Sequence, residues 1–285
     1  MPRGGTPLSQ LRRLRSVLRQ ERDKLHLTQK DVADALDWSP SKLIRIENGT
    51  VGISITDLKA LLLNYKVTDE KRVDELVAMA RAGKETAWWH KYRDQYSQSF
   101  LTFLGLESSA VRIRQAQCLG VPGILQTRDY AHAMVLARTD TTDEETIERG
   151  VEVRLERQKL LEPGGPESFF ILDESVLRRQ IGSREVMREQ LIRLKELAAL
   201  SYVTIQMVPF SAGWHRGLQS SFEIFEMSEQ EDDYALILEQ PLKDVVMEDS
   251  SEETKEYVLI FRDLLKIALS EDDTVKFIDK ILLEG

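Results

Sequence analysis

Short polar and basic side chains gather in residues 39–48, where their types favour recognition by hydrogen bonding. They are Ser39, Pro40, Ser41, Lys42, Arg45 and Asn48. Arg and Lys can donate to the guanine acceptors O6 and N7, and Ser is a more permissive reader of base edges. Asn48 and the backbone around Gly49 are positioned for phosphate contacts. Gln29 stands earlier in the chain, where its amide can reach a phosphate or brace a reading residue. These residues therefore predict an interface with double-stranded DNA.

Two short helices joined by a tight turn would present these side chains. Thr28 marks the start of the first helix, and Asp31 three residues later resembles the acidic member of a capping box. Ser39 and Pro40 mark the start of the second, because Pro is favoured at the first helical position, and Asn48-Gly49 ends it. In such a helix-turn-helix the second helix lies in the major groove. Three further helices are expected over residues 9–24, 56–65 and 69–82.

The charge of the chain is unevenly distributed. The formal net charge is -9 and the pI is about 5.2. An acidic protein whose charge is evenly spread would be repelled by DNA, which is a polyanion. Residues 1–66, however, hold 12 Lys and Arg against 7 Asp and Glu, a net charge of +5, and the rest of the chain carries −14. A basic N-terminal part on an acidic remainder is compatible with nucleic-acid binding through the N-terminal part alone.

The N-terminal motif resembles a known family. The stretches TQKDVADAL and SPSKLIRIENG are similar to the lambda-repressor-like helix-turn-helix of the XRE family of transcriptional regulators. The resemblance implies an ion pair between an Arg of the first helix and the Glu before the terminal Asn-Gly, here Arg22 and Glu47. Trp38 departs from the family pattern, which has Gly or a small aliphatic residue in the turn. The alternative, a helical bundle without a DNA partner, is disfavoured because the whole pattern matches at the right spacing.

The remainder of the chain has the pattern of a mixed domain. SFFIL, a helix over 183–199 and YVTIQMVPF read as strand, helix and strand, which is typical of a parallel crossover. SSFEIFEM and YALILEQ are expected to extend the sheet as a hairpin-like pair, and two helices close the chain. We therefore predict an all-α helix-turn-helix domain over residues 1–84, followed over 85–285 by an acidic α+β domain with a small mixed sheet.

Aromatic residues follow the expected N-terminal domain. Trp89, Tyr92, Tyr96, Phe100 and Phe103 lie at helical spacing and predict one helix with an aromatic core stripe.

Several blocks of the second domain carry another resemblance. VPGILQTRDYAHAM, VEVRLERQKLL and IQMVPFSAGWHRGLQSSFEIFE resemble the C-terminal domain of actinobacterial XRE-type regulators of the WhiJ kind. The resemblance covers most of residues 88–280. It implies a transcriptional regulator, often encoded beside a small partner protein, whose C-terminal domain has no defined biochemical activity.

Catalytic and metal-binding patterns are sparse. The chain has four His and one Cys, and it contains no HExxH, phosphate-binding loop or dinucleotide-binding motif. We expect no metal, no cofactor and no catalytic residues. Residues 211–220 are the best candidate for a ligand or partner loop, because they follow a strand and combine Gly residues with Trp214, His215 and Arg216. A structured loop without a ligand is the alternative. Arg128 and Tyr130 are weaker candidates.

Three functions fit the sequence. The first is a DNA-binding transcriptional regulator, a homodimer on a palindromic operator, whose C-terminal domain dimerises and receives a signal or partner protein. The second is a protein-interaction module that sequesters a small partner, as an antitoxin does. The third is a metabolite sensor or enzyme built on the 211–220 loop. The N-terminus lacks the apolar core of a signal peptide and no apolar run could cross a bilayer, so a cytoplasmic protein without a membrane partner is expected.

Overall fold

The chain forms two compact units. The computed structural model describes residues 7–47, 51–82, 88–139, 143–228, 233–240 and 244–284. The units are Met1–Ser97 and Gln98–Gly285, and each is considered by itself. The expected domain boundary between residues 84 and 85 falls outside the described ranges and stays a prediction.

The N-terminal unit is helical, as the sequence predicts. Its helices surround an apolar core to which Leu14 and Leu18 of the first helix, Leu43 of the third and Leu58 of the fourth contribute. The helices are α1 (Pro7–Lys24), α2 (Gln29–Ala35), α3 (Pro40–Glu47), α4 (Ile55–Asn64) and α5 (Glu70–Ala82), followed by the short 3₁₀ helix η1 (Trp88–Tyr92).

Side-chain caps fix where these helices begin. The backbone N–H of Asp31 donates to Thr28 Oγ1 (3.1 Å), and the backbone N–H of Thr28 donates to the Asp31 carboxylate (2.9 Å). This is the expected capping box of α2, and the Thr28 hydrogen bonds lower the pKa of Asp31. Ser54 caps α4 in the same way through the backbone N–H of Asp57 (3.0 Å). These caps fix the first residues of α2 and α4.

The prediction of a single aromatic helix through Trp89 and Phe103 is wrong. The structure has η1 over Trp88–Tyr92, a turn, and then α6 (Gln98–Ser109). Trp88, Tyr92 and Tyr96 meet edge to face near the turn, with ring centroids 6.1 and 6.0 Å apart. Aromatic spacing alone does not distinguish one long helix from two short ones, because edge-to-face ring contacts can also hold a turn.

The C-terminal unit is built on the mixed sheet that the sequence predicts. The strand order is β3-β2-β1-β4-β5-β6, with β1, β2 and β3 parallel and the other neighbours antiparallel. The expected crossover joins β2 and β3, and the expected hairpin-like pair is β4 and β5. The strands are β1 (Arg112–Gln117), β2 (Glu167–Asp173), β3 (Val203–Val208), β4 (Phe222–Glu226), β5 (Tyr234–Leu238) and β6 (Val245–Met247).

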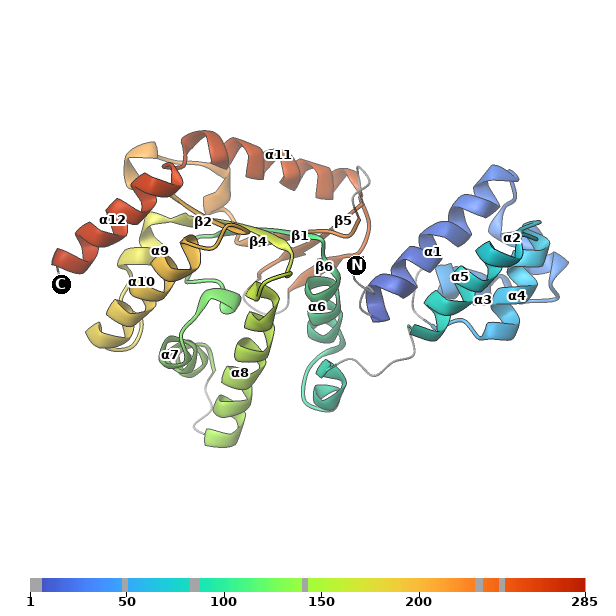
Figure 1. The fold of residues 1–285 in the computed structure, drawn as a ribbon, viewed down its shortest axis with the longest axis horizontal. Helices are drawn as coiled ribbons and strands as arrows, with labels where there is room; N and C mark the ends of the chain where they lie inside the picture. The colour runs from blue at the N-terminus through green and yellow to red at the C-terminus, as the bar shows by residue number, and fades with distance from the viewer. Residues whose placement is uncertain are drawn as a thin grey trace. The chain divides into compact units, whose positions relative to one another are not determined.

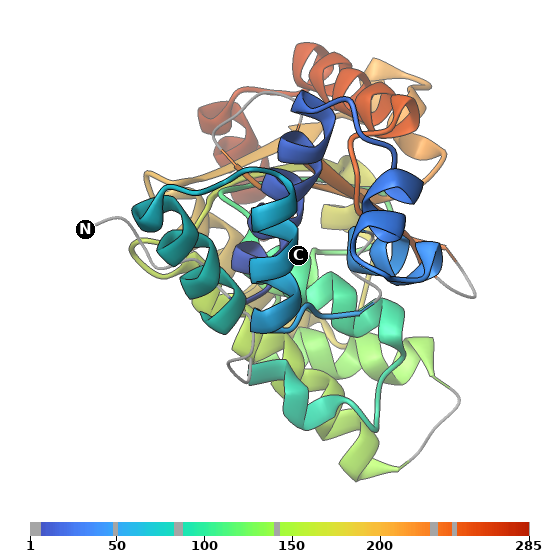
Figure 2. The ribbon, with the colours of Figure 1, turned by 90° about the vertical axis from the view of Figure 1, so that its right-hand side faces the viewer.

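Helices cover both faces of this sheet. Figure 1 shows α11 on one face and α7, α8 and α10 on the other, and the turned view of Figure 2 shows the same separation. The helices after α6 are α7 (Arg128–Arg138), α8 (Glu144–Arg157), α9 (Glu174–Arg178), α10 (Arg184–Ala198), α11 (Glu252–Ile267) and α12 (Glu271–Glu284), with 3₁₀ turns η2 (Gly123–Leu125), η3 (Gln158–Leu161), η4 (Phe210–Ala212) and η5 (Arg216–Leu218).

The covering helices explain the sequence of β2. Phe170 and Leu172 enter the core on the α10 side, whereas Ile171 between them enters the core formed with α11. A strand buried on both faces reads as a continuous apolar run, as SFFIL does. None of the helices in the described ranges is long and apolar enough to span a membrane.

Candidate nucleic-acid interface

An ion pair joins α1 to the end of α3 inside the N-terminal unit. Arg22 donates through Nε to Glu47 Oε1 (2.9 Å) and through Nη2 to Glu47 Oε2 (3.2 Å). The Glu47 side chain is only 1% exposed, and its hydrogen bonds raise the pKa of Arg22. Arg22 Nη1 also donates to the carbonyl of Leu27 (3.0 Å) in the α1–α2 turn. The pair that the family resemblance implies is therefore present, and it ties three segments together.

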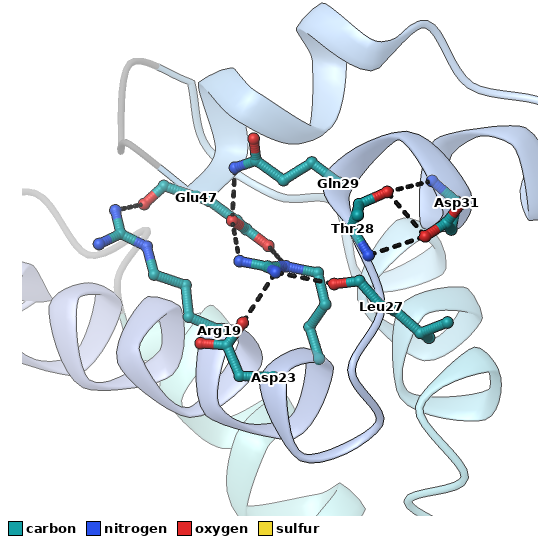
Figure 3. Close-up of polar contacts among 8 residues, drawn as sticks. Arg19, Asp23, Leu27, Thr28, Gln29, Asp31 and Glu47 are labelled. Atoms are coloured by element: carbon teal, nitrogen blue, oxygen red, sulfur yellow. Dashed lines mark hydrogen bonds and ion pairs between the residues drawn. The ribbon is translucent and has the colours of Figure 1, made fainter.

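Gln29 belongs to the same network. Its Nε2 donates to Glu47 Oε2 (2.7 Å), and Arg19 donates to the Glu47 backbone carbonyl. Figure 3 shows these contacts converging on Glu47 from α1 and α2, beside the Thr28–Asp31 cap. Of the two roles considered for Gln29, the structure shows the bracing contact, although Gln29 braces the end of α3 rather than a residue of its exposed face. A contact between Gln29 and DNA stays a prediction.

One face of α3 is exposed to solvent and the opposite face is buried. Leu43 and Ile46 are buried in the core, whereas Ser39, Pro40, Ser41 and Arg45 are exposed, as the helix-turn-helix pattern requires. Ser39 also caps the helix, since its Oγ accepts from the backbone N–H of Lys42 (3.3 Å) and lies 3.1 Å from Ser41 Oγ.

Lys42 has partners within the protein. Its Nζ lies 2.8 Å from Asp57 Oδ1 and 3.9 Å from the centroid of the Trp38 ring. The hydrogen bond from Lys42 lowers the pKa of Asp57. The sequence predicts a DNA contact for Lys42 but does not indicate Asp57 as its partner. Asp57 is distant from Lys42 in the sequence, and no local motif links the two residues. The unusual Trp38 is part of this contact, as a partly buried residue that packs on the core of the unit.

Asn48 and Gly49 lie outside the described residues, so the phosphate contact expected of Asn48 stays a prediction.

Comparison with protein families separates the two parts of the chain. Residues 10–76 match a helix-turn-helix domain, and residues 100–280 match a family described as a domain of unknown function, DUF5753. The chain belongs to the DUF5753 family. No curated protein and no solved structure matches it. The DUF5753 match begins within α6, ends within α12 and includes all six strands, so this protein combines a DNA-binding helix-turn-helix with a complete α+β unit of unassigned role.

The three residues of the candidate ligand or partner loop have different surroundings in the DUF5753 domain, and a role of this loop in binding stays a prediction. The Trp214 side chain is 72% exposed, whereas the His215 side chain is buried with Nε2 3.6 Å from Asp173 Oδ2. Arg216 pairs with Glu256 of α11 (2.7 Å). The structure therefore shows a loop packed on α11 with one exposed aromatic residue.

Gly217 allows this loop to pack closely. A Cβ at this position would lie 2.8 Å from Leu264 Cδ1 on α11, closer than side chains tolerate. The weaker candidates are also engaged, since Tyr130 is fully buried and Arg128 pairs with Glu148.

Metal ligands are not clustered in the described part of this DUF5753 protein. Within those ranges, no group of three or more His, Cys, Asp or Glu side chains is arranged to hold a metal ion.

Proposed function

We propose that this protein is a sequence-specific transcriptional regulator that binds a palindromic operator as a homodimer. Its DUF5753 domain would dimerise and receive a signal or a partner protein, as the resemblance to WhiJ-like XRE regulators implies. The observation that carries the proposal is the exposed face of α3, whose orientation the Arg22–Glu47–Gln29 network holds. A braced helix with exposed Ser41 and Arg45 can enter a major groove without rearrangement.

We propose that Arg45 contacts the edge of a base in the major groove. It is exposed on α3, and an Arg that pairs with guanine contributes about 1–3 kcal/mol of discrimination. We expect Arg45→Ala to weaken binding to the selected operator by roughly tenfold to a hundredfold and binding to random DNA much less. Fluorescence anisotropy at one fixed salt concentration measures both affinities.

Arg81→Ala is the matched control, because Arg81 is an exposed arginine in the last turn of α5. It should leave operator binding unchanged. Equal losses on operator and random DNA for Arg45→Ala would remove Arg45 from base reading.

The operator itself is found by selecting bound sites from a randomised DNA library. A homodimer of helix-turn-helix domains selects two half-sites about one helical turn, roughly 34 Å, apart. A palindrome with this spacing supports the dimer, and a single asymmetric half-site contradicts it.

A second candidate function is the capture of a small partner protein by the DUF5753 domain. It is favoured by the exposed apolar side chains of the 210–218 segment, where Phe210 is 56% and Trp214 is 72% exposed. Exposed apolar patches are typical of protein-binding surfaces. Co-purification of the product of an adjacent gene, lost in Trp214→Ala, tests it. If the two proteins mix without interacting, this candidate fails.

A further inference from the structure

The DUF5753 domain contains a cavity that none of the sequence motifs indicated. Its volume is about 270 Å³, near the lower end of the range of roughly 300–1,000 Å³ for small-molecule sites. Strands β1, β4 and β5 contribute to it, together with residues from α6, α7, α8 and the η2 turn. Its lining includes Phe103, Gln117, Gln126, Arg157, Glu223 and Glu239.

Two buried residues of the lining each have an oxygen without a partner. Glu223 is 4% exposed and Gln126 is 3% exposed. Glu223 Oε1 accepts from Gln115 Nε2 (2.9 Å), and Gln126 Nε2 donates to the carbonyl of Val121 (2.8 Å). Among the described residues, nothing donates to Glu223 Oε2 or Gln126 Oε1. A buried acceptor without a donor is costly, so both atoms indicate a missing hydrogen-bond donor.

The buried cation of the lining, Arg157, is already paired. Arg157 donates to both oxygens of the buried Glu107 at 2.7 Å, and its guanidinium lies 4.6 Å from the centroid of the Phe103 ring. This bidentate pair commits the Arg157 guanidinium to Glu107. Arg157 still lowers the pKa of Glu223 through its charge, but less than burial raises it. Burial is accordingly the main cause of the strongly raised pKa of Glu223.

The other charged residues of the lining leave an excess of acceptors. Glu239 accepts from Gln117 Nε2 (2.6 Å), and burial raises its pKa as well. Arg154 donates to the carbonyl of Gly150 (2.7 Å). Arg138 is exposed at the end of α7, and Asp244 adds a further carboxylate. With Arg157 paired to Glu107, the lining holds three further carboxyl groups and two further arginines, so it is rich in hydrogen-bond acceptors.

The remaining lining is apolar and partly aromatic. It consists of Phe100, Phe103, Leu119, Val121, Met134 and Ile237. A ligand that fits both parts needs N–H donors at one end and an apolar body at the other.

We propose that this cavity binds a small molecule with a protonated amine or amidine group on an apolar body, whose N–H groups donate to Glu223 and Gln126. The proposal deepens the proposed function, because it names the chemical class of signal that the C-terminal domain receives. Occupation of the cavity does not depend on DNA, so the two proposals can fail separately.

The test uses the full chain and named probes. Benzamidine and phenethylamine carry the required donors on an aromatic body, and benzoate has the same size with the opposite charge. We expect a saturable, concentration-dependent rise in Tm and a calorimetric binding isotherm with benzamidine or phenethylamine, and neither with benzoate.

Substitutions locate the binding. Glu223→Gln keeps the shape of the side chain and removes the charge, and it should weaken amine binding by roughly tenfold or more, because a charged hydrogen bond is lost. The fold should tolerate this change, because burial raises the pKa of Glu223 and so disfavours its charged form while the cavity holds no cation. A bound ammonium or amidinium would favour the charged form, and only then does the lost charge matter. Glu189→Gln, an exposed carboxylate of α10, is the matched control and should bind the probes as the native chain does. Should Glu223→Gln fail to fold, Glu239→Gln at the same cavity should weaken binding in its place.

Four results would overturn the proposal: no saturable binding of either amine, equal binding of benzoate, unchanged binding by both glutamate variants, or a crystal structure at saturating benzamidine with only ordered water in the cavity. Amine binding without any operator selected from the DNA library would instead leave the cavity site standing and remove the proposed function.

Discussion

At the scale of single residues, the end of α3 depends on one buried carboxylate. Glu47 accepts hydrogen bonds from Arg22 and Gln29 while its side chain is nearly inaccessible to solvent. A buried ion pair adds little net stability to a fold, but the loss of one partner leaves the other as a buried charge without a counter-charge. The pair therefore matters more for the position of α3 than as a net source of stability.

Arg22→Ala should lower the free energy of unfolding of the N-terminal unit by about 3–5 kcal/mol, because Glu47 then keeps a buried charge without its cation. Urea denaturation of the full chain, followed by amide hydrogen exchange in α3, measures the loss. Arg72→Ala is the control, since Arg72 forms only an exposed pair with Glu75 and its loss should cost less than about 1 kcal/mol. A similar cost for both variants would show that the buried pair is unimportant.

The proposed contact of Lys42 with DNA competes with the pair that Lys42 forms with Asp57. The Lys42–Asp57 contact measures 2.8 Å and both side chains are partly exposed. Asp57→Asn removes the competing carboxylate and a negative charge near the interface, so DNA should bind more tightly, by roughly twofold to tenfold.

Two further variants test whether the gain passes through Lys42. In a Lys42→Ala background the effect of Asp57→Asn should shrink, and Asp34→Asn, which removes an exposed carboxylate of α2, should have a smaller effect than Asp57→Asn. Binding anisotropy of the four members of the cycle gives the coupling. An unchanged gain without Lys42 would assign the effect to net charge alone.

At the scale of elements, the caps set the geometry that these residues need. Thr28 and Asp31 satisfy each other's backbone N–H groups at the first turn of α2, and Gln29 follows directly after the cap. Without the cap, the first turn of α2 would fray and the Gln29 contact with Glu47 would weaken.

Thr28→Ala should lower the free energy of unfolding by about 1 kcal/mol, the usual cost of losing a hydroxyl N-cap. Thr28→Ser keeps the hydroxyl and should be nearly neutral. Chemical denaturation of the two variants provides the measurement. Equal stability of the two would mean that water replaces the cap without cost.

At the scale of the whole molecule, the two parts of the chain carry net charges of opposite sign. The first 66 residues carry a net charge of +5 and the remainder carries −14. An acidic domain repels the DNA backbone, so binding should depend on the N-terminal unit and on counterion release from the phosphates it contacts.

Operator affinity should therefore fall steeply with salt. With about four phosphate contacts, the dissociation constant should rise on the order of a hundredfold between about 50 and 200 mM salt. Arg45→Ala, which removes the proposed base contact, should leave the slope of log K against log salt nearly unchanged. A flat salt dependence would contradict docking through the basic unit.

The sequence by itself determined the elements with local codes. Hydroxyl caps, Pro at a first helical position and apolar periodicity specify the helices around Thr28 and Ser39, because these effects act within one or two turns. The order of an apolar strand, a helix and a second strand predicted the parallel crossover from β2 to β3, because parallel neighbours need a long helical connection. The prediction of a single aromatic helix was wrong, because the ring contacts of Trp88, Tyr92 and Tyr96 are compatible with a turn as well as with a helix.

Only the tertiary structure decided which side chains meet across the chain. The pair of Lys42 with Asp57 and the hydrogen bond from Gln29 to Glu47 join residues from different helices, and no local pattern announces either contact. The cavity around Glu223 is formed by strands and helices whose side chains are spread from Phe100 to Asp244. The periodicity of apolar residues indicates which face of a helix or strand is buried. Whether a buried acceptor has a hydrogen-bond donor depends on which side chains the tertiary packing places within hydrogen-bond distance of it.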